Sequence, residues 1–175
     1  VLSGSILQRA PVQAFILGGG IVLFVAWTVA FTASLHANSV RGGAAALALG
    51  LGAGFAALWS GGIFGYGAVA LGAAAGGFLL MQMLLGQPIH AGLVFCLSAG
   101  VVASLIAAAA LVYGVFGWLP LAIFALVPLA ARLPLPARWP VWGQSILASL
   151  YTLLCGGAAL LAARVQSRGW PSWLQ

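Results

Sequence analysis

The sequence predicts an all-α integral membrane protein, a polytopic bundle of about six transmembrane helices with short loops and no soluble domain. Three observations lead to this prediction. The 175 residues are 64% hydrophobic and only 3% charged, whereas a soluble domain carries charge on about a quarter of its residues. The apolar stretches are long enough for helices to cross a hydrocarbon core, which takes about 20 residues each. They are continuous and rich in Ala, Leu and Gly, without the alternation of barrel strands.

Polar and Pro-rich breaks divide the chain into six predicted spans, which make up a single transmembrane domain over residues 1–175. A secretory signal peptide is the competing interpretation of the first span. The stretch from Pro11 to His36 is long enough to cross a bilayer and is followed by Arg41, so we expect a retained helix. The spans lie near residues 12–36, 43–60, 62–86, 90–112, 115–131 and 142–163.

The second and third predicted spans carry glycines four residues apart. Small residues at that spacing line one helix face and allow a second helix backbone to approach closely. At most of these positions we expect packing between helices of this chain, while part of the face docks another subunit. The candidate interface residues are Gly50, Gly54, Gly61, Gly65, Gly72 and Gly76.

The fifth predicted span contains Pro120 and Pro128. Each proline removes a backbone donor and clashes with the preceding turn, so we expect this helix to kink or break. Broken helices bind ions or solutes in transporters, which keeps a small permease open as an alternative function. The two halves of the chain, 12–86 and 90–163, show no inverted repeat, because the glycine-rich pattern of the first is absent from the second. This weakens the transporter interpretation.

Six spans place both chain ends on one side, which we call side A, and gather polar side chains on the other, side B. His36 ends the first span and His90 begins the fourth, so both lie on side B. Two imidazoles at one face are able to ligate haem iron axially, bind a transition metal or hydrogen-bond a quinone. The simpler interpretation is that both histidines lie in the hydrated headgroup zone and bind no cofactor.

The same side holds the polar side chains that a permeating solute would meet. The candidate substrate-binding residues are Arg41, Gln87 and Gln144. The six arginines divide evenly between sides A and B in this topology, so the positive-inside rule assigns no orientation. A topology with five or seven spans instead of six would divide the arginines differently between the two sides.

The missing residue types exclude most chemistry. The chain has no Asp, Glu or Lys, so nucleophilic catalysis lacks an orienting acid, proton coupling lacks an intramembrane carboxylate and Schiff-base chemistry lacks its amine. We therefore expect no enzyme, no catalytic residue and no resident metal. The formal charge of +6 comes from scattered arginines rather than from a basic face, which argues against nucleic-acid binding.

The sequence thus predicts a non-catalytic integral membrane subunit, an accessory or scaffolding component of a larger membrane complex. A small permease or channel for a neutral or anionic solute is the alternative, and a haem- or quinone-binding membrane anchor subunit is a weaker one. The expected partners are the lipid bilayer and other membrane protein subunits. Arginine without lysine, beside abundant Ala, Gly and Leu, is typical of GC-rich bacterial genomes and indicates a multi-pass protein of the cytoplasmic (inner) membrane.

Overall fold

The computed structural model describes residues 11–59, 62–63, 65–90, 92–113, 117–136 and 138–167, and the regular structure in these ranges is all helical. Five of the helices are long and apolar enough to cross a membrane. They are α2 (Pro11–Ala33), α3 (Ser39–Trp59), α4 (Gly65–Leu85), α5 (Gly92–Val112) and α8 (Val141–Ser167). Two short helices, α6 (Trp118–Phe124) and α7 (Val127–Ala130), lie between α5 and α8. The all-α prediction is confirmed for the described residues.

Five predicted spans match the five long helices to within a few residues, and the span predicted over residues 115–131 contains a shorter described stretch. The apolar helical stretch there runs only from Trp118 to Ala130, which gives about 20 Å against a hydrocarbon core of about 30 Å. Pro128 has no N–H to bond to the carbonyl four residues before it, which interrupts the stretch between α6 and α7. The Leu126 N–H bonds to the Ile123 carbonyl at 3.0 Å, so the helix tightens at this point before α7 continues it.

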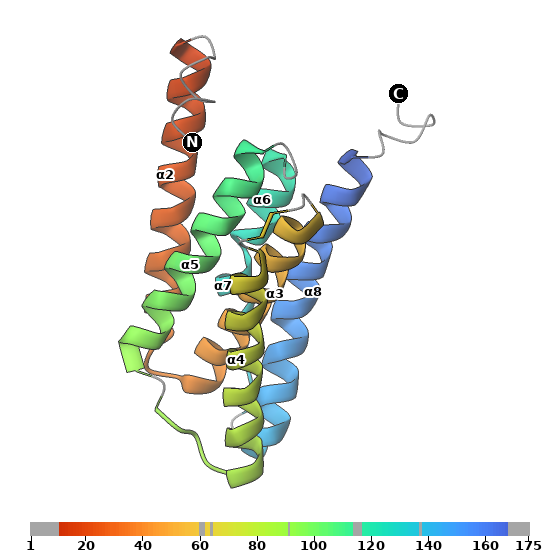
Figure 1. Ribbon diagram of the computed structural model, residues 1–175. Coiled ribbons are helices and arrows are strands. Elements are labelled where there is room, and N and C mark those ends of the chain that lie inside the picture. The colour runs from red at the N-terminus through yellow and green to blue at the C-terminus, as the bar shows by residue number, and fades with distance from the viewer. Residues whose placement is uncertain are drawn as a thin grey trace.

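The long helices lie side by side, with α2 and α4 running from side A to side B and α3, α5 and α8 running in the opposite direction (Figure 1). α3 is the central helix, since it packs against α4, α5 and α8, whereas α2 packs mainly on α5. The first turns of α2 project beyond the rest of the bundle. Side B is the end where α2 and α4 finish. Because α5 ends at side A and α8 begins at side B, the segment through α6 and α7 still joins the two ends of the bundle (Figure 1).

Local signals explain where the helices at side B begin and end. The Asn38 side-chain carbonyl accepts a hydrogen bond from the Arg41 N–H at 3.1 Å, which caps the start of α3. Gly86 has a φ of 65° just after α4, the left-handed conformation that glycine adopts most readily at a helix end. Pro88 follows two residues later and prevents the helix from continuing.

Side chains from α2 and α8 bind the carbonyl groups around the break between α6 and α7. Trp27 of α2 donates from Nε1 to the Ala125 carbonyl at 3.1 Å. Cys155 of α8 donates from Sγ to the Ile123 carbonyl at 3.4 Å. The break is therefore a fixed part of the helix packing, with its carbonyls bonded to donors of the same chain.

Two glycines make room for the large side chains of α6. A Cβ on Gly52 of α3 would lie 2.5 Å from Cε2 of Phe124, which is completely buried. A Cβ on Gly20 of α2 would lie 2.5 Å from Cη2 of Trp118. Through these two side chains α6 reaches α3 and α2, while the helix itself packs mainly on α8.

The glycines predicted as a packing interface lie mainly between α3 and α4. A Cβ on Gly50 would lie 2.5 Å from the Gly72 nitrogen, and a Cβ on Gly65 would lie 2.9 Å from the Gly54 carbonyl oxygen. These distances are shorter than any normal contact between a side chain and a backbone atom. The two helix backbones therefore touch along this line, as small residues four apart allow.

The remaining two predicted interface positions differ from these four. A Cβ on Gly76 would lie 3.3 Å from Cδ1 of Leu47, so Gly76 also faces α3 but less closely. Gly61 lies outside the described residues. The inner face of α4 is thus occupied by α3 of the same chain.

Candidate functional site

A polar pocket of about 280 Å³ opens at side B, where four segments of the chain meet. These segments are the turn between α2 and α3, the first residues of α3, the loop between α4 and α5, and the first turn of α8. The lining residues are His36, Ala37, Asn38, Ser39, Val40, Pro88, His90, Val141 and Gln144. The pocket combines both histidines and one of the three candidate substrate-binding residues.

The two histidines enter the pocket from different loops and differ in how they are held. Nδ1 of His36 lies 2.8 Å from the Ala33 carbonyl oxygen. Since a carbonyl only accepts, Nδ1 carries the proton and Nε2 is the nitrogen left for a ligand. His90 is exposed and makes no hydrogen bond with the described residues. Sequence reasoning placed both residues on side B, and the structure brings them to one pocket.

Two amide side chains of the pocket are fixed by backbone hydrogen bonds. The Asn38 oxygen caps α3, as described above, which leaves its Nδ2 donor unused. Gln144 donates from Nε2 to the Trp139 carbonyl at 2.9 Å, which ties the start of α8 to the preceding connector. The rim of the pocket is therefore held in place by hydrogen bonds to nearby backbone groups, not by contacts across the pocket.

Gln82 of α4 lies behind Ser39 and was missed in the sequence analysis. Its side chain is completely buried. Its Oε1 accepts a hydrogen bond from the Ser39 hydroxyl at 3.1 Å, while its Nε2 is buried without a partner. An amide in the middle of an apolar run was the available signal, since Gln82 stands between two methionines. Buried polar groups without partners are rare in proteins and call for an explanation.

The other two candidate substrate-binding residues do not line the pocket. Arg41 donates from Nη1 to the Arg132 carbonyl at 3.3 Å. The Arg132 guanidinium in turn lies 4.6 Å from the ring centroid of Phe31 and donates to the Ser34 hydroxyl. These contacts fasten the end of α7 to α2 and α3. Gln87 is exposed on the loop after α4.

The donor set of the pocket limits which cofactors fit. The described residues contain no group of three or more His, Cys, Asp or Glu side chains placed to hold a metal ion. The volume of about 280 Å³ lies just below the range of common ligand pockets, which is about 300–1,000 Å³. Haem and quinone therefore remain sequence-based predictions without support from the pocket's size.

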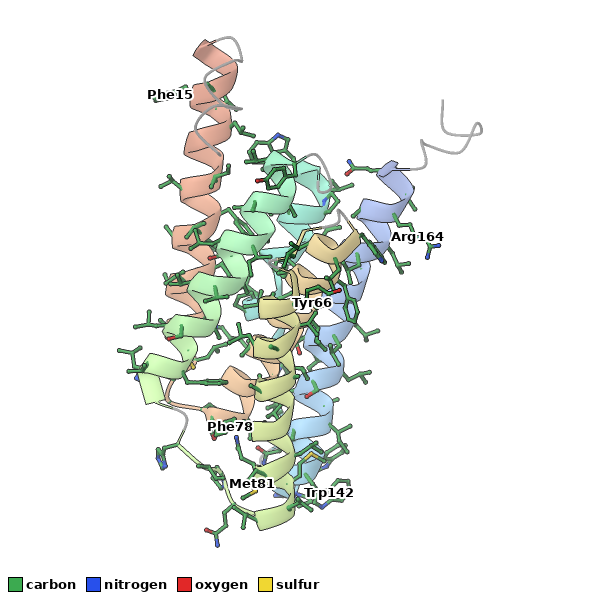
Figure 2. The ribbon with its side chains drawn as sticks, in the orientation of Figure 1. Phe15, Tyr66, Phe78, Met81, Trp142 and Arg164 are labelled. Atoms are coloured by element: carbon green, nitrogen blue, oxygen red, sulfur yellow. The ribbon has the colours of Figure 1, made fainter. Side chains whose placement is uncertain are left out.

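A second hollow, of about 510 Å³, runs between α4 and α8 on the outside of the bundle and is almost entirely apolar. Met81 of α4 and Trp142 of α8 lie near the side B ends of the two helices (Figure 2). Its lining residues are Leu47, Ala73, Gly76, Gly77, Leu79, Leu80, Met83, Ser145, Ile146, Ser149, Leu150 and Leu153. We call this hollow the α4–α8 groove.

Comparison with protein-family models, with curated proteins and with solved structures finds no match to this chain. Function therefore has to be argued from the residues of the pocket, the groove and the helix surfaces.

Proposed function

We propose that this chain is a multi-pass membrane protein of the bacterial cytoplasmic membrane that serves as a non-catalytic subunit of a larger membrane complex. The observation that carries the proposal is the outer face of α4. This face presents small residues to the outside of the bundle, directly beside the α4–α8 groove. A transmembrane helix of another subunit is the occupant that we propose for this surface.

The outer face of α4 is as flat as its inner face. Its exposed small residues are Gly67, Ala70, Ala73, Ala74 and Gly77. Positions 67, 70, 74 and 77 are three and four residues apart, so they lie along one stripe of the helix. A Cβ on Gly67 or Gly77 would meet no atom within 4 Å. Small residues on an open stripe let a second helix come close, which drives association where lipid removes the hydrophobic effect.

The groove adds a polar group to this surface. Ser145 lines the groove, is 2% exposed, and has a buried Oγ without a hydrogen-bond partner. Ser149 lies one turn further along the same wall. Hydroxyls of this kind hydrogen-bond across helix pairs in membranes, for about 1 kcal/mol each. A partner helix that places an acceptor or donor in the groove would satisfy Ser145.

Charge favours a different subunit over a second copy of this chain. All fixed side-chain charges are positive, with six arginines and no Asp or Glu. Two copies would bring like charges together at the rims of the interface, whereas a partner with carboxylates at its helix ends would complement them. We therefore expect a heteromeric contact.

The permease alternative has less support from the broken helix. In transporters, the carbonyls freed by a helix break face the solute. Here the carbonyls of Ile123 and Ala125 accept hydrogen bonds from Cys155 and Trp27. They are occupied by the chain's own donors, so we do not assign them to a solute.

A bulky residue on the outer face of α4 tests the proposal. In native membranes solubilised with a mild detergent, the wild-type chain should migrate in blue-native electrophoresis as part of a larger complex. Gly77→Trp should release it, because the indole fills the groove that the partner helix uses. The change should leave the fold intact, since a Cβ at Gly77 meets open space.

Gly19→Trp is the matched control. Gly19 lies on α2 and also has no atom within 4 Å of its Cβ position, but it is remote from the groove. This variant should stay in the complex. A wild-type chain that runs alone, or a Gly77→Trp chain that remains fully assembled, would contradict the proposed function.

A further inference from the structure

We infer that the partner helix in the α4–α8 groove carries an uncharged carboxamide side chain, Asn or Gln, which hydrogen-bonds to Ser145 and Ser149 of α8. This inference rests on the proposed function, because it concerns the transmembrane helix of another subunit that is proposed there. It adds the chemical group by which that helix is recognised and the level of the membrane at which the group lies.

The hydroxyl of Ser145 is bonded differently from other hydroxyls in the helices of this chain. A Ser or Thr within a helix often bonds to a carbonyl of the preceding turn. The Thr32 hydroxyl donates to the Thr28 carbonyl at 2.6 Å, and the Ser104 hydroxyl donates to the Val101 carbonyl at 3.1 Å. The Ser145 hydroxyl is buried and has no partner in the described part of the chain. Its hydrogen bonds are therefore left for a group from outside the chain.

Ser149 supplies a second unused hydroxyl on the same wall of the groove. It lies one turn after Ser145, is half-buried, and makes no hydrogen bond with the described residues. Thr28 also has a buried hydroxyl without a partner among the described residues, but it lies on α2 and lines neither hollow. The two unused hydroxyls that line the groove are thus neighbours on one helix face.

A carboxamide fits these two hydroxyls better than other polar side chains. It has an oxygen that accepts and an NH₂ group that donates, so it can bond to both serines at once. A hydroxyl on the partner would stay close to its own backbone, as the Thr152 hydroxyl does when it donates to the Ala148 carbonyl at 3.0 Å. Ser145 is 2% exposed, so the partner group has to reach into the groove. A carboxylate would bury a charge beside lining residues that are all uncharged, which is costly inside a membrane.

The position of the serines places the carboxamide in the side B half of the membrane. Ser145 lies in the second turn of α8, which begins at side B (Figure 1). A second copy of this chain is a poor source of the group at that level. Gln82 is completely buried and bonded to Ser39, and Gln144 is bonded to the Trp139 carbonyl. The carboxamide therefore has to come from a different subunit.

The first step of the test identifies the partner segment that lies against Ser145. Ile146 is the next residue, is 51% exposed and lines the groove. A photoreactive residue at position 146 is crosslinked in native membranes, and mass spectrometry sequences the attached peptide. We expect an apolar segment of another membrane protein with an Asn or Gln within about one helical turn of the crosslinked residue.

The second step measures whether the serines and the carboxamide act on each other. Ser145→Ala combined with Ser149→Ala should lower the association constant in detergent about fivefold. Replacing the partner's Asn or Gln by Leu should lower it by a similar factor. Because both changes remove the same hydrogen bonds, making them together should be little worse than making either one.

Ser98→Ala is the matched control, since Ser98 is exposed on α5 and does not line the groove. This variant should associate as the wild type does. If position 146 crosslinks to no other membrane protein, the proposed function fails and the inference fails with it. A captured segment that has no carboxamide at that level, a double serine variant that associates like the wild type, or effects that simply add in the cycle would overturn the inference alone.

Discussion

The inner and outer faces of α4 are built from the same residue types and have opposite surroundings. Gly65 and Gly72 on the inner face touch the backbone of α3, while Gly67 and Gly77 on the outer face meet no atom within 4 Å. The difference teaches that small residues at helical spacing indicate a helix face that can pack closely. They do not indicate which helix packs against it. The partner of the inner face is α3, and the outer face has none within the described chain.

The largest expected effect comes from crowding the inner face. Gly50→Leu places a branched side chain where even a Cβ would lie 2.5 Å from the Gly72 nitrogen. Because the crowded atom belongs to the backbone of α4, α3 and α4 have to separate. We expect the free energy of unfolding to fall by about 3 kcal/mol or more. Titration with sodium dodecyl sulfate in mixed micelles, followed by far-ultraviolet circular dichroism, measures this. Equal losses for Gly50→Leu and Gly77→Leu would erase the distinction between the two faces.

An intermediate effect of opposite sign is expected in the groove. Ser145→Ala removes a buried hydroxyl that has no partner in the isolated chain, so the free energy of unfolding should rise by up to about 1 kcal/mol. The same change should weaken the assembled complex, because the partner loses a hydrogen bond. The detergent titration above and blue-native electrophoresis measure the two quantities. A loss of stability in the isolated chain would mean that Ser145 is already bonded.

The smallest effect is expected at the side A end of the outer face. Gly67→Ala adds one methyl group in open space, and alanine favours a helix over glycine by about 1 kcal/mol. The free energy of unfolding should stay the same or rise by less than that amount in the same titration. A clear loss would show that an unrecognised part of this chain covers the outer face.

The sequence alone was sufficient to predict where the helices lie along the chain. It was not sufficient to predict how each helix is rotated about its own axis. Runs of about 20 apolar residues define a helix regardless of its neighbours, which is why five predicted spans agree closely with α2, α3, α4, α5 and α8. The break at Pro128 was expected, because the missing N–H is a local property. The described stretch around it, Trp118–Ala130, lies within the span predicted over residues 115–131.

The candidate site likewise has features that the sequence predicts and features that it does not. His36 and His90 were placed on one side by counting spans, which needs no knowledge of packing. That they line one pocket depends on how far α4 and α8 extend beyond the α2–α3 turn, which the sequence does not specify. Gln82, Ser39 and Ser145 were missed for the same reason. Whether a polar residue in an apolar run faces a pocket, a groove or lipid depends on the rotation of its helix.

The most direct test of the proposed function is site-specific photo-crosslinking in native membranes from two matched leucines. Leu80 on the outer face of α4 is 59% exposed and lines the groove, while Leu105 on α5 is 54% exposed and does not. A photoreactive residue at position 80 should form a crosslink to one different membrane protein, and the same residue at position 105 should not. Crosslinks to a second copy of this chain, equal crosslinking from both positions, or none from position 80 would contradict the account.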